Sequence, residues 1–311
     1  MQGWILYKRS QEELSELDHG VNRLLAAAAT LGIQLEVYKP DQFELIVTQA
    51  ERKSILLNGV RVALPDFLLP RLGAESSYFA LAIIRQLEKS GVYTCNSSNA
   101  IEAVRDKMLL SQLLAQSELP FPKTMLIKFP VPVSVVEREI GFPLVIKNIC
   151  GRGGIGIHLC ESASSFRDLM ELMATHSGNN QMILQEFISS SYGRDLRVFV
   201  VGGKVIGSMQ RKSTGSFKAN YSLGGSVSHY PINEEIRQMA VDCAALFNLE
   251  IAGVDLLFAE NGFKICEANS SPGFKGMEQA TETDVAMQIL SYVRDVVTRR
   301  SKGKASLYQQ L

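Results

Sequence analysis

The sequence predicts an α/β protein that is divided into two or three lobes. Short apolar runs alternate with amphipathic helical stripes over residues 1–100, whereas hairpin patterns rich in β-branched residues dominate the second half of the chain. With 311 residues, 46% of them hydrophobic, the chain can bury a large core. We therefore expect an N-terminal domain with a small, mostly parallel sheet, followed by α+β lobes.

The N-terminal third follows the order strand, helix, strand, hairpin, strand, helix, strand. Ligands on parallel sheets gather at the carboxyl ends of the strands, and Arg71 directly follows an apolar strand at residues 67–70. Arg71 is thus a candidate clamp for a substrate carboxylate, with a structural ion pair as the alternative. The expected elements are strands at 3–8, 34–38, 67–70 and 93–95, helices at 12–31 and 76–89, and an edge hairpin formed by 43–48 and 54–57.

A helix is expected over residues 96–117, and the prolines between Pro120 and Pro132 then indicate a linker that ends the first domain. The next signal is a glycine run between two strands, at 144–147 and 157–160. A dinucleotide fingerprint must open a helix, which this context excludes. We predict a glycine-rich hairpin that folds over phosphates, with Lys147 pointing inward; a flexible surface hairpin with one lysine is the alternative. The glycines are Gly151, Gly153, Gly154 and Gly156.

The strand at 182–188 places Gln185 and Glu186 among apolar neighbours, an arrangement typical of adenine sites where main-chain groups meet the ring. A long hairpin follows at 195–211, around Gly202-Gly203. It carries Asp195, Arg197 and Arg211, which suit anionic phosphates and carboxylates, although solvated strand faces are an equally common setting for such arginines.

The stretch from Ile251 to Gly276 predicts a hairpin at Asn261-Gly262 that gathers oxygen-bearing side chains. Asp255, Glu267 and Asn269 form a set with too few cations to neutralise it, which favours Mg²⁺; a solvated hairpin face is the alternative. A regular two-residue turn would place Asp255 opposite Ala268, with Glu267 and Asn269 on the other face. The metal hypothesis therefore requires a bulge or an odd loop, which we predict between Leu256 and Lys264.

Composition excludes several classes of function. Lys plus Arg equals Asp plus Glu at 32 each, so charge gives no indication of a nucleic-acid partner. No apolar run has the length of a membrane span, and five scattered cysteines predict free thiols, so we expect a cytoplasmic protein. Only four histidines are present, without a convincing Ser-His-Asp or Cys-His set.

The order of these motifs resembles the ATP-grasp superfamily, and most closely the RimK-type α-L-glutamate ligases. The resemblance covers nearly all of residues 1–300. It implies an ATP-grasp fold with an N-terminal domain at 1–100, a central lobe at 101–185 and a C-terminal lobe at 186–311. The segments that carry it are Arg105-Asp106-Lys107, Gln185-Glu186-Phe187-Ile188, Asp195-Leu196-Arg197, Gly253-Val254-Asp255 and Glu267-Ala268-Asn269-Ser270-Ser271-Pro272-Gly273.

The resemblance also implies a role for each candidate residue. Binding of ATP falls to Lys107, Lys147, Gly153, Gly154, Gly156, Gln185, Glu186, Phe187, Ile188, Asp195, Lys218, Ala219 and Asn220. Arg211 and Lys147 are the implied catalytic residues, and Asp255, Glu267 and Asn269 the implied metal ligands. Arg71, Arg197, Ser271 and Gly273 are the implied substrate contacts.

The implied activity is ATP-dependent carboxylate–amine ligation through an acylphosphate, with Mg²⁺, or alternatively Mn²⁺, as the metal. The partners would be a glutamate-like amino acid and a carboxyl group on a peptide, a protein C-terminus or a cofactor, in a homo-oligomer without nucleic acid or membrane. Two alternatives are a nucleotide-binding scaffold without ligase activity and an ATP-grasp ligase of another specificity, such as a D-alanine or glutathione type.

Overall fold

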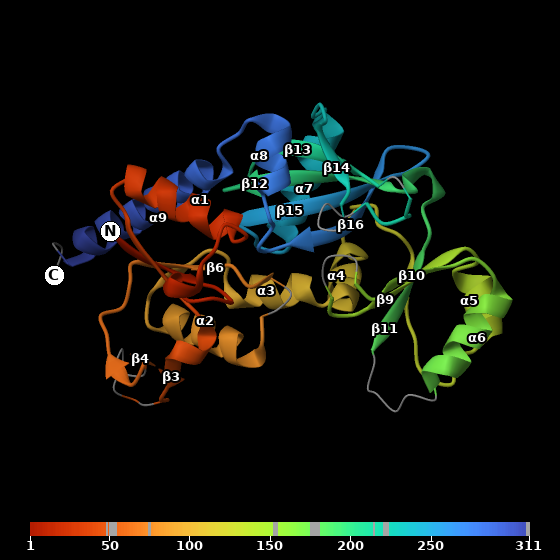
Figure 1. Cartoon of the computed structure of the whole chain (residues 1–311), viewed down its shortest axis with the longest axis horizontal. Coiled ribbons are helices and arrows are strands. Elements are labelled where there is room, and N and C mark those ends of the chain that lie inside the picture. The colour runs from red at the N-terminus through yellow and green to blue at the C-terminus, as the bar shows by residue number, and fades with distance from the viewer. Residues whose placement is uncertain are drawn as a thin grey trace.

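The protein folds into three sheet-based lobes (Figure 1), and among the described residues no helix is both long and apolar enough to cross a membrane. The computed structural model describes residues 1–47, 49, 55–73, 76–151, 155–174, 181–213, 215–219 and 224–308, with side chains to residue 302.

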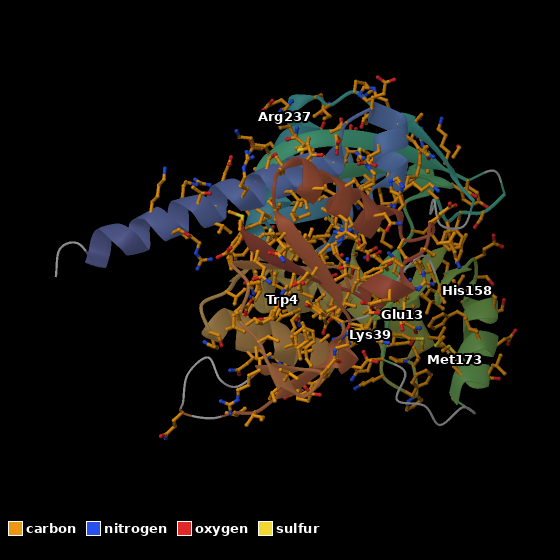
Figure 2. All side chains as sticks on the ribbon, turned by 60° about the vertical axis from the view of Figure 1, so that its left-hand side comes forward. Trp4, Glu13, Lys39, His158, Met173 and Arg237 are labelled. Atoms are coloured by element: carbon orange, nitrogen blue, oxygen red, sulfur yellow. The ribbon has the colours of Figure 1, made fainter. Side chains whose placement is uncertain are left out.

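The N-terminal lobe is built on a parallel sheet with the order β2-β1-β6-β7. Its strands are β1 (Gln2–Leu6), β2 (Gln34–Tyr38), β6 (Phe67–Pro70) and β7 (Tyr93–Thr94), with the helices α1 (His19–Thr30) and α2 (Tyr78–Lys89). Trp4, which is 2% exposed, lies inside this lobe (Figure 2) and packs edge-on against Tyr38 with ring centroids 5.3 Å apart. The predicted parallel sheet is confirmed.

Two N-terminal predictions need correction. The helix expected from residue 12 begins only at His19, because Asp18 accepts hydrogen bonds from the Ser15 backbone N–H, Tyr7 and Arg9 and so holds the preceding loop outside the helix. The expected two-stranded edge hairpin is a three-stranded antiparallel sheet, in which the turn at Asn58-Gly59 joins the second and third strands. These strands are β3 (Phe43–Leu45), β4 (Ile55–Leu57) and β5 (Val60–Arg61).

The helix predicted over 96–117 is divided at Asp106. The backbone there has φ −87° and ψ 106°, outside the helical region, and the Asp106 side chain accepts hydrogen bonds from the N–H groups of Met108 and Leu109. The same residue therefore ends one helix and caps the next. The two helices are α3 (Ser98–Arg105) and α4 (Lys107–Leu114).

The central lobe is an antiparallel sheet with the order β10-β9-β11-β8. Phe166 and Val136 from its two helices are fully buried in a core shared with the strands. Its elements are β8 (Thr124–Leu126), α5 (Val133–Glu139), β9 (Leu144–Asn148), β10 (Ile157–Cys160), α6 (Ala163–Ala174) and β11 (Met182–Glu186). The strands on either side of the glycine run pair as predicted, with Lys147 opposite Ile157.

The C-terminal lobe is a five-stranded antiparallel sheet with the order β14-β13-β12-β15-β16. Its elements are β12 (Arg194–Val201), β13 (Lys204–Lys212), β14 (Ser226–His229), α7 (Glu234–Leu246), β15 (Ile251–Phe258), β16 (Phe263–Asn269), α8 (Lys275–Thr281) and α9 (Val285–Tyr308). Helix α7 covers one face. Helices α8, α9 and α1 share a core with the other face, which joins this lobe to the N-terminal sheet.

The hairpin β15–β16 contains the predicted irregularity. Asp255 pairs with Glu267, but Leu256 pairs with Ile265, so Cys266 is an extra residue that bulges from β16. The bulge lies just outside the interval that we predicted, and the turn is centred one residue earlier, with Ala259 N–H donating to the Gly262 carbonyl. In a regular strand residues 265 and 267 would share a face. The bulge instead turns Ile265 into the core and Glu267 to the opposite side.

Asn96 fastens the N-terminal lobe to the C-terminal sheet. Its Nδ2 atom donates to the carbonyls of Ile251 and Ser270, both at 2.7 Å. Its Oδ1 atom accepts from the N–H groups of Glu250 and Ile251, at 2.7 and 3.0 Å. With 1% exposure, this side chain uses both donors and both acceptor positions on buried backbone groups.

We expect Asn96→Ala to lower the free energy of unfolding by about 3 kcal/mol or more, because each buried group left without a partner costs roughly 1–3 kcal/mol. Asn233→Ala is the control: Asn233 makes one capping bond, to Ile236 N–H, and its loss should cost about 1 kcal/mol. Unfolding in denaturant measures the free energy of unfolding of both variants. Equal decreases in the two variants would contradict the conclusion that Asn96 joins the two lobes.

Candidate active site

A row of alternating charges lies on one face of the C-terminal sheet. Arg211 holds Asp195 through two hydrogen bonds of 2.6 and 2.7 Å, and Arg197 holds Asp255 through two of 2.7 Å. Arg211 Nη2 also donates to Asp255 Oδ2 at 2.9 Å. The register explains the row, because Asp195 faces Arg211 across β12–β13 and Arg197 faces Asp255 across β12–β15.

This arrangement corrects the expectation that the carboxylates lack cations. Asp255 is 4% exposed and Arg211 is 3% exposed, and burial alone would raise the pKa of the Asp255 carboxyl. The guanidinium groups of Arg197 and Arg211 outweigh burial and lower that pKa. Burial would likewise lower the pKa of Arg211, but Asp255 and Asp195 raise it. Both partners therefore stay charged at neutral pH.

The three predicted metal ligands share this face. Glu267 lies opposite Asp255, and Asn269 Nδ2 donates to the Gly253 carbonyl at 3.2 Å and reaches Asp255 Oδ2 at 3.4 Å. A carboxylate oxygen can accept two hydrogen bonds, so Oδ2 of Asp255 is saturated, whereas Oδ1 accepts one and keeps one position. The Glu267 side chain is 32% exposed, and one cation of the described residues lies within 4 Å of it, Lys107 Nζ at 3.9 Å.

The donor set fits Mg²⁺ only with water or substrate oxygens completing the coordination. Glu267 and Asn269 can each offer an oxygen, and Asp255 a single one, which matches the few protein ligands that Mg²⁺ usually takes. Within the described part of the chain no group of three His, Cys, Asp or Glu side chains forms a closed metal cage.

The two predicted phosphate lysines approach this face from the central lobe and from α4. Lys147 is 8% exposed; its Nζ donates to Gln185 Oε1 at 2.6 Å and lies 3.5 Å from Sγ of the bulged Cys266. Lys107 Nζ donates to the Gly151 carbonyl at 3.0 Å. Lys147 is therefore a buried side chain that links the central sheet to β16.

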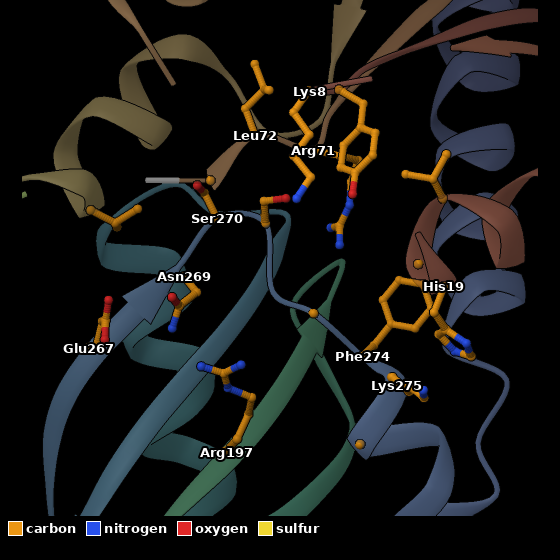
Figure 3. A pocket seen from close by; sticks show the side chains of 18 of the residues that line it. Lys8, His19, Arg71, Leu72, Arg197, Glu267, Asn269, Ser270, Phe274 and Lys275 are labelled. Carbon is orange, nitrogen blue, oxygen red and sulfur yellow. The ribbon is translucent and has the colours of Figure 1, made fainter. Parts of the chain in front are cut away.

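A cavity of about 460 Å³ lies beside the charge row (Figure 3). It is lined by the ends of β1 and β6, the start of α1, the α3–α4 junction, β12, β13 and β16, and the segment that leads into α8. The cavity thus lies at the carboxyl ends of parallel strands, as predicted. It brings together the predicted residues Arg71, Lys107, Arg197, Arg211, Glu267, Asn269, Ser271 and Gly273.

Arg71 points into the cavity without a carboxylate within 4 Å among the described residues. Its Nη2 donates to the Pro272 carbonyl at 2.8 Å, and its guanidinium lies 5.7 Å from the centroid of the Phe274 ring. Burial lowers the pKa of Arg71 to about 10. The structural ion pair, our alternative for this residue, is not formed with any described residue, and an anion from outside the chain would complete the site.

The other predicted residues that the structure describes do not line the cavity. Gln185 pairs with Lys147, Glu186 pairs with Lys264 at 2.8 Å, and the segment through Ile188 joins β11 to the C-terminal lobe. Both oxygens of Asp195 are held by Arg211, and its ribose role stays a prediction. Gly156 has φ +72°, a conformation that suits glycine. Lys218 and Ala219 lie between β13 and β14, whereas Gly153, Gly154 and Asn220 lie outside the described residues.

The cavity also contains basic residues to which the sequence analysis assigned no role, although Arg105 belongs to one of the segments that carry the resemblance. Lys8 follows β1 and points inward beside Arg71 (Figure 3), Lys275 begins α8, and Arg105 ends α3. Lys8 follows its strand in the same way as Arg71 follows β6. Because ligands gather at the carboxyl ends of parallel strands, Lys8 could have been identified from the sequence. Lys275 carries no such signal, because α8 itself was not predicted.

Two family models match the chain: the RimK PreATP-grasp domain over residues 14–101 and the RimK-like ATP-grasp domain over residues 104–293. A protein of Aliivibrio fischeri (strain MJ11), named "Probable alpha-L-glutamate ligase", is 36% identical over 289 residues, which are 92% of this chain and 95% of that protein.

Solved structures share the fold at lower identity. The RimK domain ATP-grasp protein from Sphaerobacter thermophilus has a TM-score of 0.73 and 19% identity, covering 94% of this chain and 99% of that one. The ATP-grasp ligase PsnB, complexed with minimal precursor, Mg and ADP, has a TM-score of 0.70 and 19% identity, covering 97% and 98%. The fold, the family models and the 36% identity along the chain agree, and the protein belongs to the RimK-like ATP-grasp family.

Proposed function

We propose that the protein is an ATP-dependent carboxylate–amine ligase that activates a carboxyl group as an acylphosphate and joins it to the amino group of glutamate or a similar amino acid. One observation supports this function: the cavity beside the charge row is lined by more cations than anions. Seven Lys or Arg side chains line it against two acids, Asp18 and Glu267. A site with this balance favours a substrate that carries several negative charges.

We assign the residues to different parts of the two substrates according to their positions. Lys107 and Lys147 would bind the phosphates of ATP, and the segment from Gln185 to Ile188, between two lobes, would hold the adenine. Arg71, at the far side of the cavity, would bind a carboxylate of the substrate, because its own charge has no acidic partner among the described side chains. The reacting groups would then meet beside Glu267 and Arg211.

The protein promotes ligation mainly by positioning the reacting groups and by electrostatic stabilisation of the charge that develops on them. A carboxylate oxygen attacks the γ-phosphorus, the bond to the bridging oxygen breaks, and the amine later displaces phosphate from the acylphosphate. Mg²⁺ held by Glu267, Asn269 and Oδ1 of Asp255 would neutralise charge on the phosphate oxygens. Arg211, fixed by two carboxylates, presents a donor that needs no reorganisation during transfer.

The named relative supports glutamate as the amino acid, and the complex of PsnB with precursor peptide PsnA2 supports a peptide as the carboxyl substrate. The alternatives are a nucleotide-binding scaffold and a ligase of another specificity. A cytoplasmic location, a homo-oligomeric assembly and use of Mn²⁺ stay predictions.

Measurement of ADP release tests the proposal directly. The protein would be mixed with ATP, Mg²⁺, glutamate and a panel of carboxyl substrates that includes peptides ending in glutamate. Stimulation that requires both glutamate and one panel member supports the ligase. If ATP binds but no combination stimulates ADP release, the scaffold alternative replaces it.

Glu267→Gln should lower turnover by about a hundredfold or more, because charge stabilisation by a metal is worth several kcal/mol. The midpoint of thermal unfolding should not change, because the one charged contact of Glu267 in the described structure is that of its Oε1 atom with Lys107 Nζ at 3.9 Å. Turnover would be measured against Mg²⁺ concentration. Glu260→Gln, at the exposed turn of the same hairpin, is the control. Near-normal turnover of Glu267→Gln at limiting Mg²⁺ would remove Glu267 from the metal site.

Lys147→Met should weaken ATP binding roughly ten- to a hundredfold, the value of one charge-assisted hydrogen bond. It should also lower stability by about 1–3 kcal/mol, because Gln185 Oε1 stays buried without its donor. Calorimetric titration and thermal unfolding measure the two effects. The exposed Lys128→Met is the control in the same lobe. A Lys147→Met variant that binds ATP like the parent would show that this lysine is purely structural.

A further inference from the structure

Arg105 lies in the last turn of α3 and lines the cavity, yet no part of the described chain satisfies it. Its Nε atom is buried and has no hydrogen-bond partner among the described residues. No carboxylate of the described chain lies within 4 Å of its guanidinium, in contrast to Arg197 and Arg211, which are both paired.

The surroundings explain why Arg105 has no partner. Asp106, its neighbour, uses Oδ1 to cap α4 through Met108 and Leu109. Glu267, an acid of the same cavity, has its Oε1 atom 3.9 Å from Lys107 Nζ. A buried donor without an acceptor costs free energy, so an external acceptor accounts for the retained guanidinium better than a structural role does.

We propose that Arg105 is a catalytic residue that binds the γ-phosphoryl group of ATP. The inference rests on the proposed function and deepens it. Arg105 shares its cavity with Lys107 and Glu267, the proposed phosphate and metal residues. The helix break at Asp106 allows Arg105 and Lys107, which are two residues apart in the chain, to line the same cavity. A guanidinium presents a planar fork of donors that matches two phosphate oxygens.

The role fits the chemistry of transfer. As the substrate carboxylate oxygen bonds to the γ-phosphorus and the bridging oxygen leaves with its electron pair on ADP, negative charge spreads over the three equatorial oxygens. Arg105 donates hydrogen bonds to those oxygens. ADP has no γ-phosphoryl group, so the contribution of Arg105 should be specific to the triphosphate.

The test compares two nucleotides on Arg105→Met. Affinities for AMPPNP and for ADP, each with Mg²⁺, would be measured by calorimetric titration of the full chain. We expect AMPPNP to bind roughly ten- to a hundredfold more weakly, the value of a charge-assisted hydrogen bond, and ADP to change by less than about twofold. Arg105→Lys, which keeps the charge without the fork, should recover part of the loss.

Thermal unfolding provides a second readout. Loss of an unsatisfied donor should leave the midpoint of Arg105→Met equal to that of the parent or higher. Arg85→Met, at an exposed ion pair with Glu102, is the matched control and should change neither affinity.

Equal weakening of both nucleotides, or no weakening of AMPPNP, would overturn the assignment of Arg105, and so would a lowered midpoint together with unchanged affinities. Failure of the proposed function has a different signature: no combination of glutamate and a carboxyl substrate would then stimulate ADP release by the unsubstituted protein, even if that protein binds both nucleotides.

Discussion

The site depends on the requirement that every charge on the buried face of the C-terminal sheet be paired. Taking Asp255 and Arg211 out of water is costly unless opposite charges and hydrogen bonds compensate. The row Asp195, Arg211, Asp255, Arg197 meets this requirement across three adjacent strands. Each side chain in the row is hydrogen-bonded to the next one, so the row is a rigid polar surface. A substrate can bind to it without further reorganisation of these side chains.

Two local irregularities orient functional side chains toward the cavity beside this row. The extra residue Cys266 turns Glu267 away from the core, where Ile265 remains, and toward the cavity. The break at Asp106 ends α3 so that Arg105 and Lys107 both reach the same cavity. Without either irregularity, the regular period of the strand or helix would carry these side chains to other faces.

The cavity exists because the N-terminal and C-terminal lobes are held together. Asn96 binds backbone groups at the start of β15 and just after β16, and helices α1 and α9 share one core. The ends of β1 and β6, which carry Lys8 and Arg71, therefore face the charge row across a cavity. Neither lobe alone contains the unpaired cations and the carboxylates that the proposed reaction uses together.

The sequence by itself determined most of the elements and several candidate residues of the site. Apolar periodicity located most strands, and strand ends with glycine-rich and acidic segments identified Arg71, Lys147 and the set around Asp255, because local pattern and motif order depend on near neighbours. Even the need for a bulge followed from counting residues between Asp255 and Glu267. Only the tertiary structure decided which charges neutralise one another and which stay unpaired. That outcome depends on the register between β12, β13 and β15 and on the approach of lobes far apart in sequence. Arg197 and Arg211 therefore became paired cations, whereas Arg71 and Arg105 line the cavity without an acidic partner among the described residues.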